Sequence, residues 1–270
     1  MSLPARQSAV ITGRRLTWRE AGAGPALVLV HGIGGSSLSW EPQLAAFAAS
    51  HRVIAWDAPG YGGSESFAAP APRADDYAAS LAALLGSLGV TRAHFVGHSL
   101  GAIMVAALLR GGAITAESVT FLHGVTGSGR IDPAARETLR RSRIADLTAM
   151  GMDRFARERG RLILGPQTPA PALARAIEVM ADVPEAGYLQ AWEMMCAADI
   201  FADLPALTSP VLVICGSADP VAPEASCRAV AAAIPQARFE LLPEIGHYAS
   251  LEAPEVFNRL LAAFLAARAS

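Results

Sequence analysis

Short runs of hydrophobic residues alternate along the chain with longer segments in which hydrophobic positions recur at helical spacing. The run Ala26–Val30 contains no polar residue, which is typical of a parallel strand covered by helices on both faces. Similar runs predict further strands at Val53–Trp56, His94–Val96, Val119–Leu122, Val211–Ile214 and Phe239–Leu242. The intervening segments predict helices at Tyr77–Leu88, Ala102–Arg110, Glu224–Ile234 and Pro254–Ala267. This alternation predicts an α/β fold with a mostly parallel sheet, right-handed crossovers and helices on both faces.

Two regions depart from the alternation. Ser8–Thr12 and Arg15–Glu20 flank Gly13-Arg14 and predict an opening hairpin. Further along, Ala134–Met150 and Ala172–Met180 have helix-forming patterns, and no convincing strand lies near them. We therefore predict a core formed by residues 1–125 and 200–270, with a helical cap inserted at residues 126–199.

Composition removes several classes of function. All 22 basic residues are arginine, so mechanisms that need a lysine Schiff base or a phosphate-loop lysine are excluded. The net charge is −2 and no basic stripe is present, which argues against a nucleic-acid partner.

No apolar stretch is long enough to span a membrane, so a cytoplasmic protein is the default expectation. The three cysteines, Cys196, Cys215 and Cys227, are too few and too scattered for a disulfide framework, and we expect small buried hydrophobic residues. The sequence predicts no oligomeric state.

Arginines are concentrated in the predicted cap. The cluster comprises Arg140, Arg141, Arg143, Arg154, Arg157, Arg159 and Arg161. Acidic residues such as Glu137 and Glu158 are interspersed among them. This mixture predicts a solvated helical face rather than a docking patch.

Ser99 is the candidate nucleophile. It lies in Gly97-His98-Ser99-Leu100-Gly101, where a predicted strand turns sharply into a predicted helix. The GxSxG spacing in this context favours a strained turn that presents the serine hydroxyl at the edge of the sheet.

A serine hydroxyl needs a nearby base, and His247 is the strongest candidate. It follows the last predicted strand, and the carboxyl ends of parallel strands meet at one edge of the sheet. His31, His51, His94, His98 and His123 all precede the cap, and we interpret them as capping or packing residues.

The base in turn needs a carboxylate to orient it. Asp219 directly follows the strand Val211–Ile214, although the sequence Asp219-Pro220 is also typical of an ordinary turn. Asp57 is the rival acid, which we interpret as holding the turn through Pro59 and Gly60.

Acyl transfer also requires donors for a developing oxyanion. We predict the backbone N–H groups of Leu100 and of Ile33, which lies in the loop His31-Gly32-Ile33-Gly34-Gly35. A glycine-rich loop of this kind can also bind phosphate, but the chain has neither a lysine nor the GxGxxG spacing.

These motifs resemble the α/β-hydrolase superfamily over nearly the whole chain, and most closely its small bacterial esterases and enol-lactonases with a helical cap. The elements that carry the resemblance are His31-Gly32 with its glycine loop, Asp57–Ser64, the turn at Ser99, Gly216–Val221 and Gly246-His247. The order Ser99, Asp219, His247 is the order of that family, which favours Asp219 over Asp57. The resemblance implies an α/β-hydrolase fold and a serine hydrolase that uses neither a metal nor an organic cofactor.

The expected substrate is an ester or lactone of a small, largely apolar acyl compound, because few charges can be assigned to the site from the sequence. Candidate pocket walls are Trp40, Phe67, Trp192 and Met195. Three alternatives stay open: a carbon–carbon hydrolase with the same triad, a non-hydrolytic oxygenase or lyase, and a ligand receptor with a vestigial triad.

Overall fold

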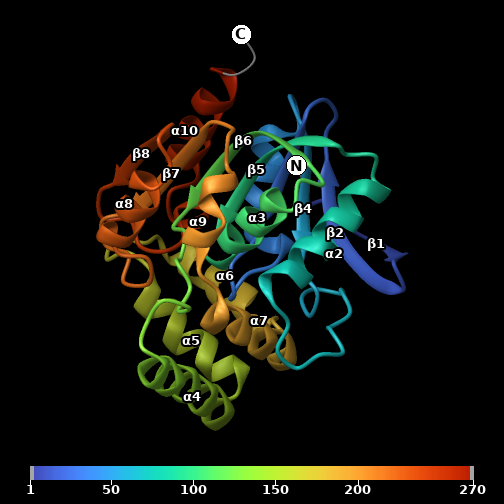
Figure 1. Cartoon of the computed structure of the whole chain (residues 1–270). Coiled ribbons are helices and arrows are strands. Elements are labelled where there is room, and N and C mark those ends of the chain that lie inside the picture. The colour runs from blue at the N-terminus through green and yellow to red at the C-terminus, as the bar shows by residue number, and fades with distance from the viewer. Residues whose placement is uncertain (1–2, 268–270) are drawn as a thin grey trace.

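An eight-stranded sheet forms the centre of the molecule (Figure 1). The structure is a computed structural model that describes residues 3–267. The strand order is β1-β2-β4-β3-β5-β6-β7-β8, with β1, β2 and β4 paired antiparallel and every later pair parallel. The strands are β1 Arg6–Ile11, β2 Arg14–Ala21, β3 Ala26–Val30, β4 Arg52–Asp57, β5 Arg92–His98, β6 Thr115–Leu122, β7 Val211–Gly216 and β8 Ala237–Leu242. The predicted mostly parallel α/β sheet is confirmed.

Helices cover both faces of this sheet. Successive residues of β3 point to opposite faces. Leu27 and Leu29 belong to the hydrophobic cluster that includes residues of α1 and α10, whereas Val28 and Val30 belong to the cluster that includes residues of α2, α3 and α8. This two-sided burial explains why the strand contains only hydrophobic residues. The helices of the core are α1 Glu41–Phe47, α2 Ala74–Ser87, α3 Leu100–Arg110, α8 Glu224–Ala232, α9 Ala249–Glu252 and α10 Pro254–Ala266, with short 3-10 helices η1 Ser37–Trp40, η2 Ile200–Ala202 and η3 Leu204–Ala206.

Four helices lie between β6 and β7, and residues 126–199 are called the cap below. They are α4 Pro133–Met150, α5 Met152–Ile163, α6 Ala170–Ala181 and α7 Glu185–Ala197. The first begins where the carboxylate of Asp132 accepts the N–H groups of Ala134 and Ala135, each at 3.0 Å, with Pro133 in the first turn. Figure 1 shows these helices gathered at one end of the sheet.

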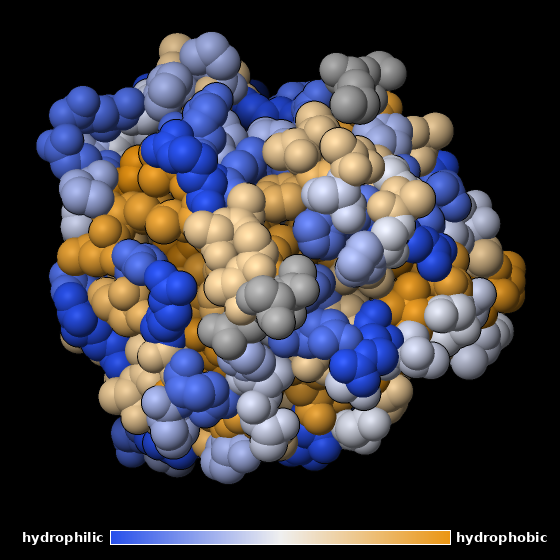
Figure 2. All heavy atoms as spheres, turned by 90° about the horizontal axis from the view of Figure 1, so that it is seen from above, coloured by the Kyte–Doolittle hydropathy of each residue, from blue (hydrophilic) through white to orange (hydrophobic). Residues whose placement is uncertain are grey.

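The opposite end of the molecule has a mixed surface. Figure 2 shows hydrophobic residues there in separate areas among hydrophilic ones, as is usual for a protein surface. Within residues 3–267, no helix combines the length and the hydrophobicity needed to cross a membrane.

Candidate active site

Ser99 lies in a strained turn between β5 and α3. Its backbone has φ 52° and ψ −117°, a conformation that non-glycine residues seldom adopt. The turn is possible because its neighbours lack side chains: a Cβ on Gly101 would lie 2.3 Å from the carbonyl oxygen of Val30, and one on Gly97 would lie 2.7 Å from that of Gly101. The N–H of Ser99 donates to the carbonyl oxygen of Leu122 at 2.9 Å. The sharp turn therefore fixes the hydroxyl at the carboxyl edge of the sheet.

The structure brings Ser99, His247 and Asp219 into one hydrogen-bonded chain. Ser99 Oγ lies 2.9 Å from Nε2 of His247, and Nδ1 of His247 lies 2.8 Å from Oδ2 of Asp219. All three residues are buried. With Nδ1–H donating to the carboxylate, Nε2 is free of its proton and can accept the one on the serine hydroxyl.

The carboxylate of Asp219 is held on both of its oxygens. Oδ1 accepts the N–H groups of Val221 at 2.8 Å and Ala222 at 3.0 Å, while Oδ2 accepts from His247 and from His123. Burial alone would raise the pKa of Asp219, but the charge of His247 and the hydrogen bonds from both histidines outweigh it and leave this pKa well below its usual value. The residue is therefore an anion throughout the neutral range.

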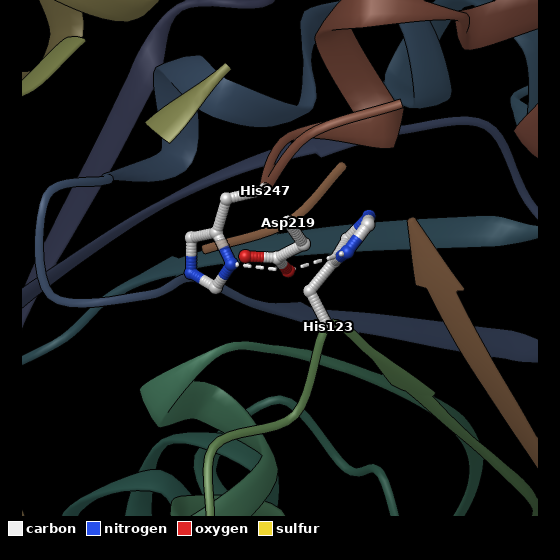
Figure 3. Close-up of side chains that lie close together, drawn as sticks. All are labelled: His123, Asp219 and His247. Carbon is white, nitrogen blue, oxygen red and sulfur yellow. Dashed lines mark hydrogen bonds and ion pairs between the residues drawn. The ribbon is translucent and has the colours of Figure 1, made fainter. Parts of the chain in front are cut away.

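His123 is a second histidine on this carboxylate, and our sequence interpretation of it as a capping or packing residue missed this contact. Its Nδ1 lies 3.0 Å from Oδ2 of Asp219, and Figure 3 shows the carboxylate between the two imidazole rings. Nε2 of His123 accepts the N–H of Ala249 at 3.3 Å, so the neutral tautomer with Nδ1–H satisfies the contacts with Asp219 and Ala249. The N–H of Gly216 also lies 3.3 Å from Nδ1, which cannot accept it in this tautomer. The available signal was its position directly after β6, at the same edge as Asp219.

These three side chains have donor atoms within 4.8 Å of one another, a spacing that a metal ion can also bridge. The separations of 2.8 and 3.0 Å between the two Nδ1 atoms and Oδ2 are those of hydrogen bonds. Hydrogen bonding alone accounts for the arrangement.

Two further histidines, His31 and His98, bond to backbone groups around the site. Nε2 of His31 accepts the N–H of Ala58 at 3.0 Å. Nε2 of His98 donates to the carbonyl oxygen of His247 at 2.7 Å. Burial is the main cause that lowers the pKa of His31, His98 and His123, so each is neutral at pH 7. By contrast, His51 and His94 contact Ser50 and Ser118, away from the triad.

The loop after β3 aims the N–H of Ile33. The carbonyl oxygen of Gly32 accepts from Nδ1 of His31 at 2.8 Å and from the N–H of Gly35 at 3.0 Å. Because a trans peptide points its C=O and N–H in opposite directions, the Ile33 N–H faces away from those two donors. The hydroxyl of Tyr61 holds the next carbonyl, that of Ile33, at 3.0 Å. Leu100 is the first residue of α3, where an N–H has no partner inside the helix.

This geometry agrees with what comparison with known proteins finds. A sequence model described as the alpha/beta hydrolase family matches residues 27–260. The chain belongs to this family. The resemblance predicted from the sequence is confirmed.

Proteins similar to this α/β-hydrolase carry names that imply more than one reaction. The chain is 30% identical over 278 residues to a dihydrolipoyllysine-residue acetyltransferase component of an acetoin cleaving system from Pseudomonas putida, covering 97% of this chain and 70% of that protein. It is 26% identical over 248 residues to a 3-oxoadipate enol-lactonase from Acinetobacter baylyi, covering 89% and 88%. The solved enol-lactonase from Burkholderia xenovorans is 27% identical, with a TM-score of 0.82 and coverage of 96% and 100%. The family and the enol-lactonases indicate a hydrolase.

A cavity of about 540 Å³ opens between Ser99 and the cap of this α/β-hydrolase. Of the predicted wall residues, Trp192 and Met195 line it. The prediction that Trp40 and Phe67 line it is wrong. Trp40 is fully buried in the hydrophobic cluster that includes residues of α1 and α9, and Phe67 packs edge-on against Tyr77 at a centroid distance of 4.8 Å. Both belong to hydrophobic clusters, which the sequence cannot separate from a pocket wall.

Two arginines also line the cavity, Arg143 of α4 and Arg159 of α5. The sequence did not assign these two charges to the site. The predicted solvated face describes Arg140, Arg141 and Arg154, which pair with Glu137 or Glu158. The prediction of a solvated face is wrong for Arg143 and Arg159, because α4 and α5 direct these two side chains toward the cavity.

Glu252 ties the cap to the loop that carries His247. One carboxylate oxygen accepts from the N–H of Gly165 at 2.7 Å, the N–H of Gly246 at 3.0 Å and the hydroxyl of Thr168 at 2.8 Å. The other oxygen accepts the N–H of Tyr248 at 2.8 Å. In addition, the N–H of His247 donates to the carbonyl oxygen of Ile163 in α5 at 2.7 Å. The position of the histidine thus depends on the cap.

Proposed function

We propose that this protein is a serine hydrolase that cleaves an ester or lactone of a small acyl compound through a covalent acyl-enzyme. The observation that supports this most directly is the chain from Ser99 Oγ through His247 to Asp219, with hydrogen-bond distances of 2.9 and 2.8 Å. The strained backbone of Ser99 adds support, because strain of this kind concentrates at functional positions.

The acylation step follows from the chain of hydrogen bonds. Ser99 Oγ attacks the carbonyl carbon while its proton passes to Nε2 of His247, and Asp219 stabilises the imidazolium that results. The N–H groups of Ile33 and Leu100 donate to the oxyanion. When the tetrahedral intermediate collapses, the bond from carbon to the leaving oxygen breaks and that oxygen takes the proton from His247.

Deacylation repeats the same transfers with water. His247 accepts a proton from water as the water oxygen attacks the acyl carbon. Collapse breaks the bond to Ser99 Oγ, which recovers its proton from His247, and a carboxylic acid leaves. Every transfer uses side chains already in contact, so the scheme needs no metal or organic cofactor.

The carbon skeleton of the substrate is expected to lie against the apolar side of the cavity. Trp192, Met195 and Met180 supply that surface, and binding sites of this size are usually lined by such side chains. The enol-lactonase relatives support a lactone as readily as an open ester.

Labelling with a fluorophosphonate, read by mass spectrometry of the intact protein and its peptides, tests the activated serine. One adduct on Ser99 is expected, with none in Ser99→Ala. Ser226→Ala is the matched control, since Ser226 lines the same cavity without a hydrogen bond to a histidine among the described residues, and it should still be labelled at Ser99.

A substrate panel then separates the alternatives. Turnover of esters and lactones supports the proposal, whereas preferential turnover of a vinylogous diketone would indicate a carbon–carbon hydrolase. An unlabelled but folded protein that binds ligands without turning them over would overturn the proposal in favour of a receptor.

A further inference from the structure

Arg143 and Arg159 place two positive charges in the cavity that contains Ser99. No Asp or Glu of residues 3–267 is among the residues that line this cavity. Five other cap arginines have carboxylate partners within 4.0 Å: Arg130, Arg140, Arg141, Arg154 and Arg175. The two that face the cavity therefore differ from these in having no ion pair with any described residue. Arg136, Arg157 and Arg161 of the cap also have no ion pair with a described residue, and of these Arg157 and Arg161 are exposed to solvent.

Arg143 is held in place by neutral groups. Its Nη1 donates to the hydroxyl of Tyr188 at 2.9 Å. Its guanidinium lies 4.8 Å from the ring of Trp192 and 5.7 Å from that of Phe155. These contacts restrict the side chain and stabilise a cation, but they leave its charge uncompensated.

Arg159 has no hydrogen bond or ion pair with any residue that the structure describes, although it is half-buried. Burial lowers its pKa, and the positive charge of Arg143 lowers it further. Asp146 acts in the opposite direction but is exposed and lies too far away for an ion pair. Two neighbouring cations that lose water without gaining an anion are costly, so the pair indicates an absent anionic partner.

We infer that Arg143 and Arg159 bind a carboxylate on the substrate, at the cap end of the cavity, while the ester or lactone carbonyl lies at Ser99. The natural substrate would then be an ester or lactone derived from a dicarboxylic acid. This inference rests on the proposed function and revises the expectation of a small, largely apolar acyl compound by adding one carboxylate to it.

The chemistry of the guanidinium favours a carboxylate in this position. Its fork of N–H donors matches the two oxygens of a carboxylate, and such charge-assisted bonds are strong when water is largely excluded. The remaining walls include Met180, Trp192 and Met195, which suit the methylene chain between the two functional groups. A phosphate could also satisfy two arginines, and the experiment below separates the two anions.

The test compares esters that differ only in charge. Monoethyl adipate and its neutral amide analogue, in which a carboxamide replaces the free carboxylate, have nearly the same shape. For the full-length protein, kcat/KM should be at least about 30-fold higher for the acid, which corresponds to about 2 kcal/mol. An analogue with a phosphonate in place of the carboxylate should be a poorer substrate than the acid.

Arg159→Gln is the main variant because it removes no hydrogen bond with a described residue. It should lower the acid-to-amide ratio of kcat/KM by about tenfold or more, mainly through KM, and Arg159→Lys should restore part of it. Arg157→Gln, an exposed position on the same helix, is the matched control and should keep the wild-type ratio. Arg143→Gln should also lower the ratio, but it removes the bond to Tyr188 as well.

Binding distinguishes failure of this inference from failure of the proposed function. Calorimetry should show monoethyl adipate binding to Ser99→Ala more tightly than the amide does, with the difference lost when Arg159→Gln is added. The inference is overturned if the acid and the amide bind Ser99→Ala equally tightly. It is also overturned if Arg143→Gln and Arg159→Gln each keep the wild-type acid-to-amide ratio of kcat/KM. If Ser99 is not labelled by fluorophosphonate and neither ester is hydrolysed, the proposed function fails, and calorimetry still decides the carboxylate site. A phosphonate analogue that binds and reacts better than the acid would assign the site to phosphate instead.

Discussion

His123 donates from Nδ1 to the same oxygen of Asp219 that accepts Nδ1–H of His247, at 3.0 and 2.8 Å. The two rings approach the carboxylate from different strand ends, since His123 follows β6 and His247 follows β8. The carboxylate is therefore fixed relative to both sides of the site, and its charge is shared between a neutral histidine and the candidate base.

Removing this second donor should weaken hydrolysis without abolishing it. His123→Leu is expected to lower kcat/KM for a reactive ester about tenfold, because one of the hydrogen bonds that orient Asp219 is lost. His123→Asn retains an N–H near the position of Nδ1 and should recover most of the activity. Equal kcat/KM in the wild type and both variants would show that His123 only fills space.

Gly101 should tolerate no side chain. Its added Cβ would lie 2.3 Å from the carbonyl oxygen of Val30, so Gly101→Ala must displace β3 or α3 and is expected to cost about 1–3 kcal/mol in the free energy of unfolding. Esterase activity should fall more steeply, because Ser99 and Leu100 move with the turn. Gly86→Ala in α2 is the control: its Cβ would meet nothing within 4 Å, and it should be neutral or slightly stabilising. Urea denaturation of both variants, with activity measured in parallel, checks the contrast.

The sequence predicted the sheet well because two-sided burial makes its parallel strands continuously hydrophobic, as in Ala26–Val30. The antiparallel strands β1 and β2 were predicted from turn residues instead, and Gly13 indeed has a positive φ of 80°. Helix α1 was not predicted, because seven residues over Glu41–Phe47 give too short a pattern.

The residues of the candidate site also differ in how far the sequence predicts them. Ser99, Asp219 and His247 each follow a recognisable strand, so their meeting at one edge could be anticipated from topology. The inward direction of Arg143 and Arg159 could not, because it depends on how α4 and α5 pack over the core. In an isolated helical pattern, an arginine that faces a cavity looks the same as one that faces solvent.

Glu252 should be needed for both stability and activity. Its carboxylate accepts hydrogen bonds from Gly165, Gly246 and Tyr248 at 2.7, 3.0 and 2.8 Å. Glu252→Gln replaces an acceptor oxygen with an N–H that faces those donors. The free energy of unfolding is therefore expected to fall by about 2–3 kcal/mol. kcat/KM should decrease as well, since Gly246 precedes His247. Glu244→Gln is the matched control, because its carboxylate is exposed and, among the described residues, accepts a hydrogen bond only from the side chain of Gln167. The backbone N–H of Glu244 donates to the hydroxyl of Ser217, and the substitution leaves that bond in place. Thermal melting that moves equally in the two variants would contradict the special role of Glu252.

Stability should fall as the pH is lowered from 7 to 5.5. Burial lowers the folded-state pKa of His31, His98 and His123 below the ordinary value of 6.5, so in this window the unfolded chain binds protons that the folded protein does not. The free energy of unfolding then decreases with falling pH, by at most about 1.4 kcal/mol per pH unit for each histidine. Asp219 contributes no slope there, because it is ionised in both states: the unfolded chain has the ordinary pKa of 3.8, and the folded protein has a lower pKa. Urea titrations at several pH values measure the slope, and His98→Asn should reduce it because one of these groups no longer titrates. A wild-type stability that stays constant down to pH 5.5 would show that these histidines accept protons in the folded protein.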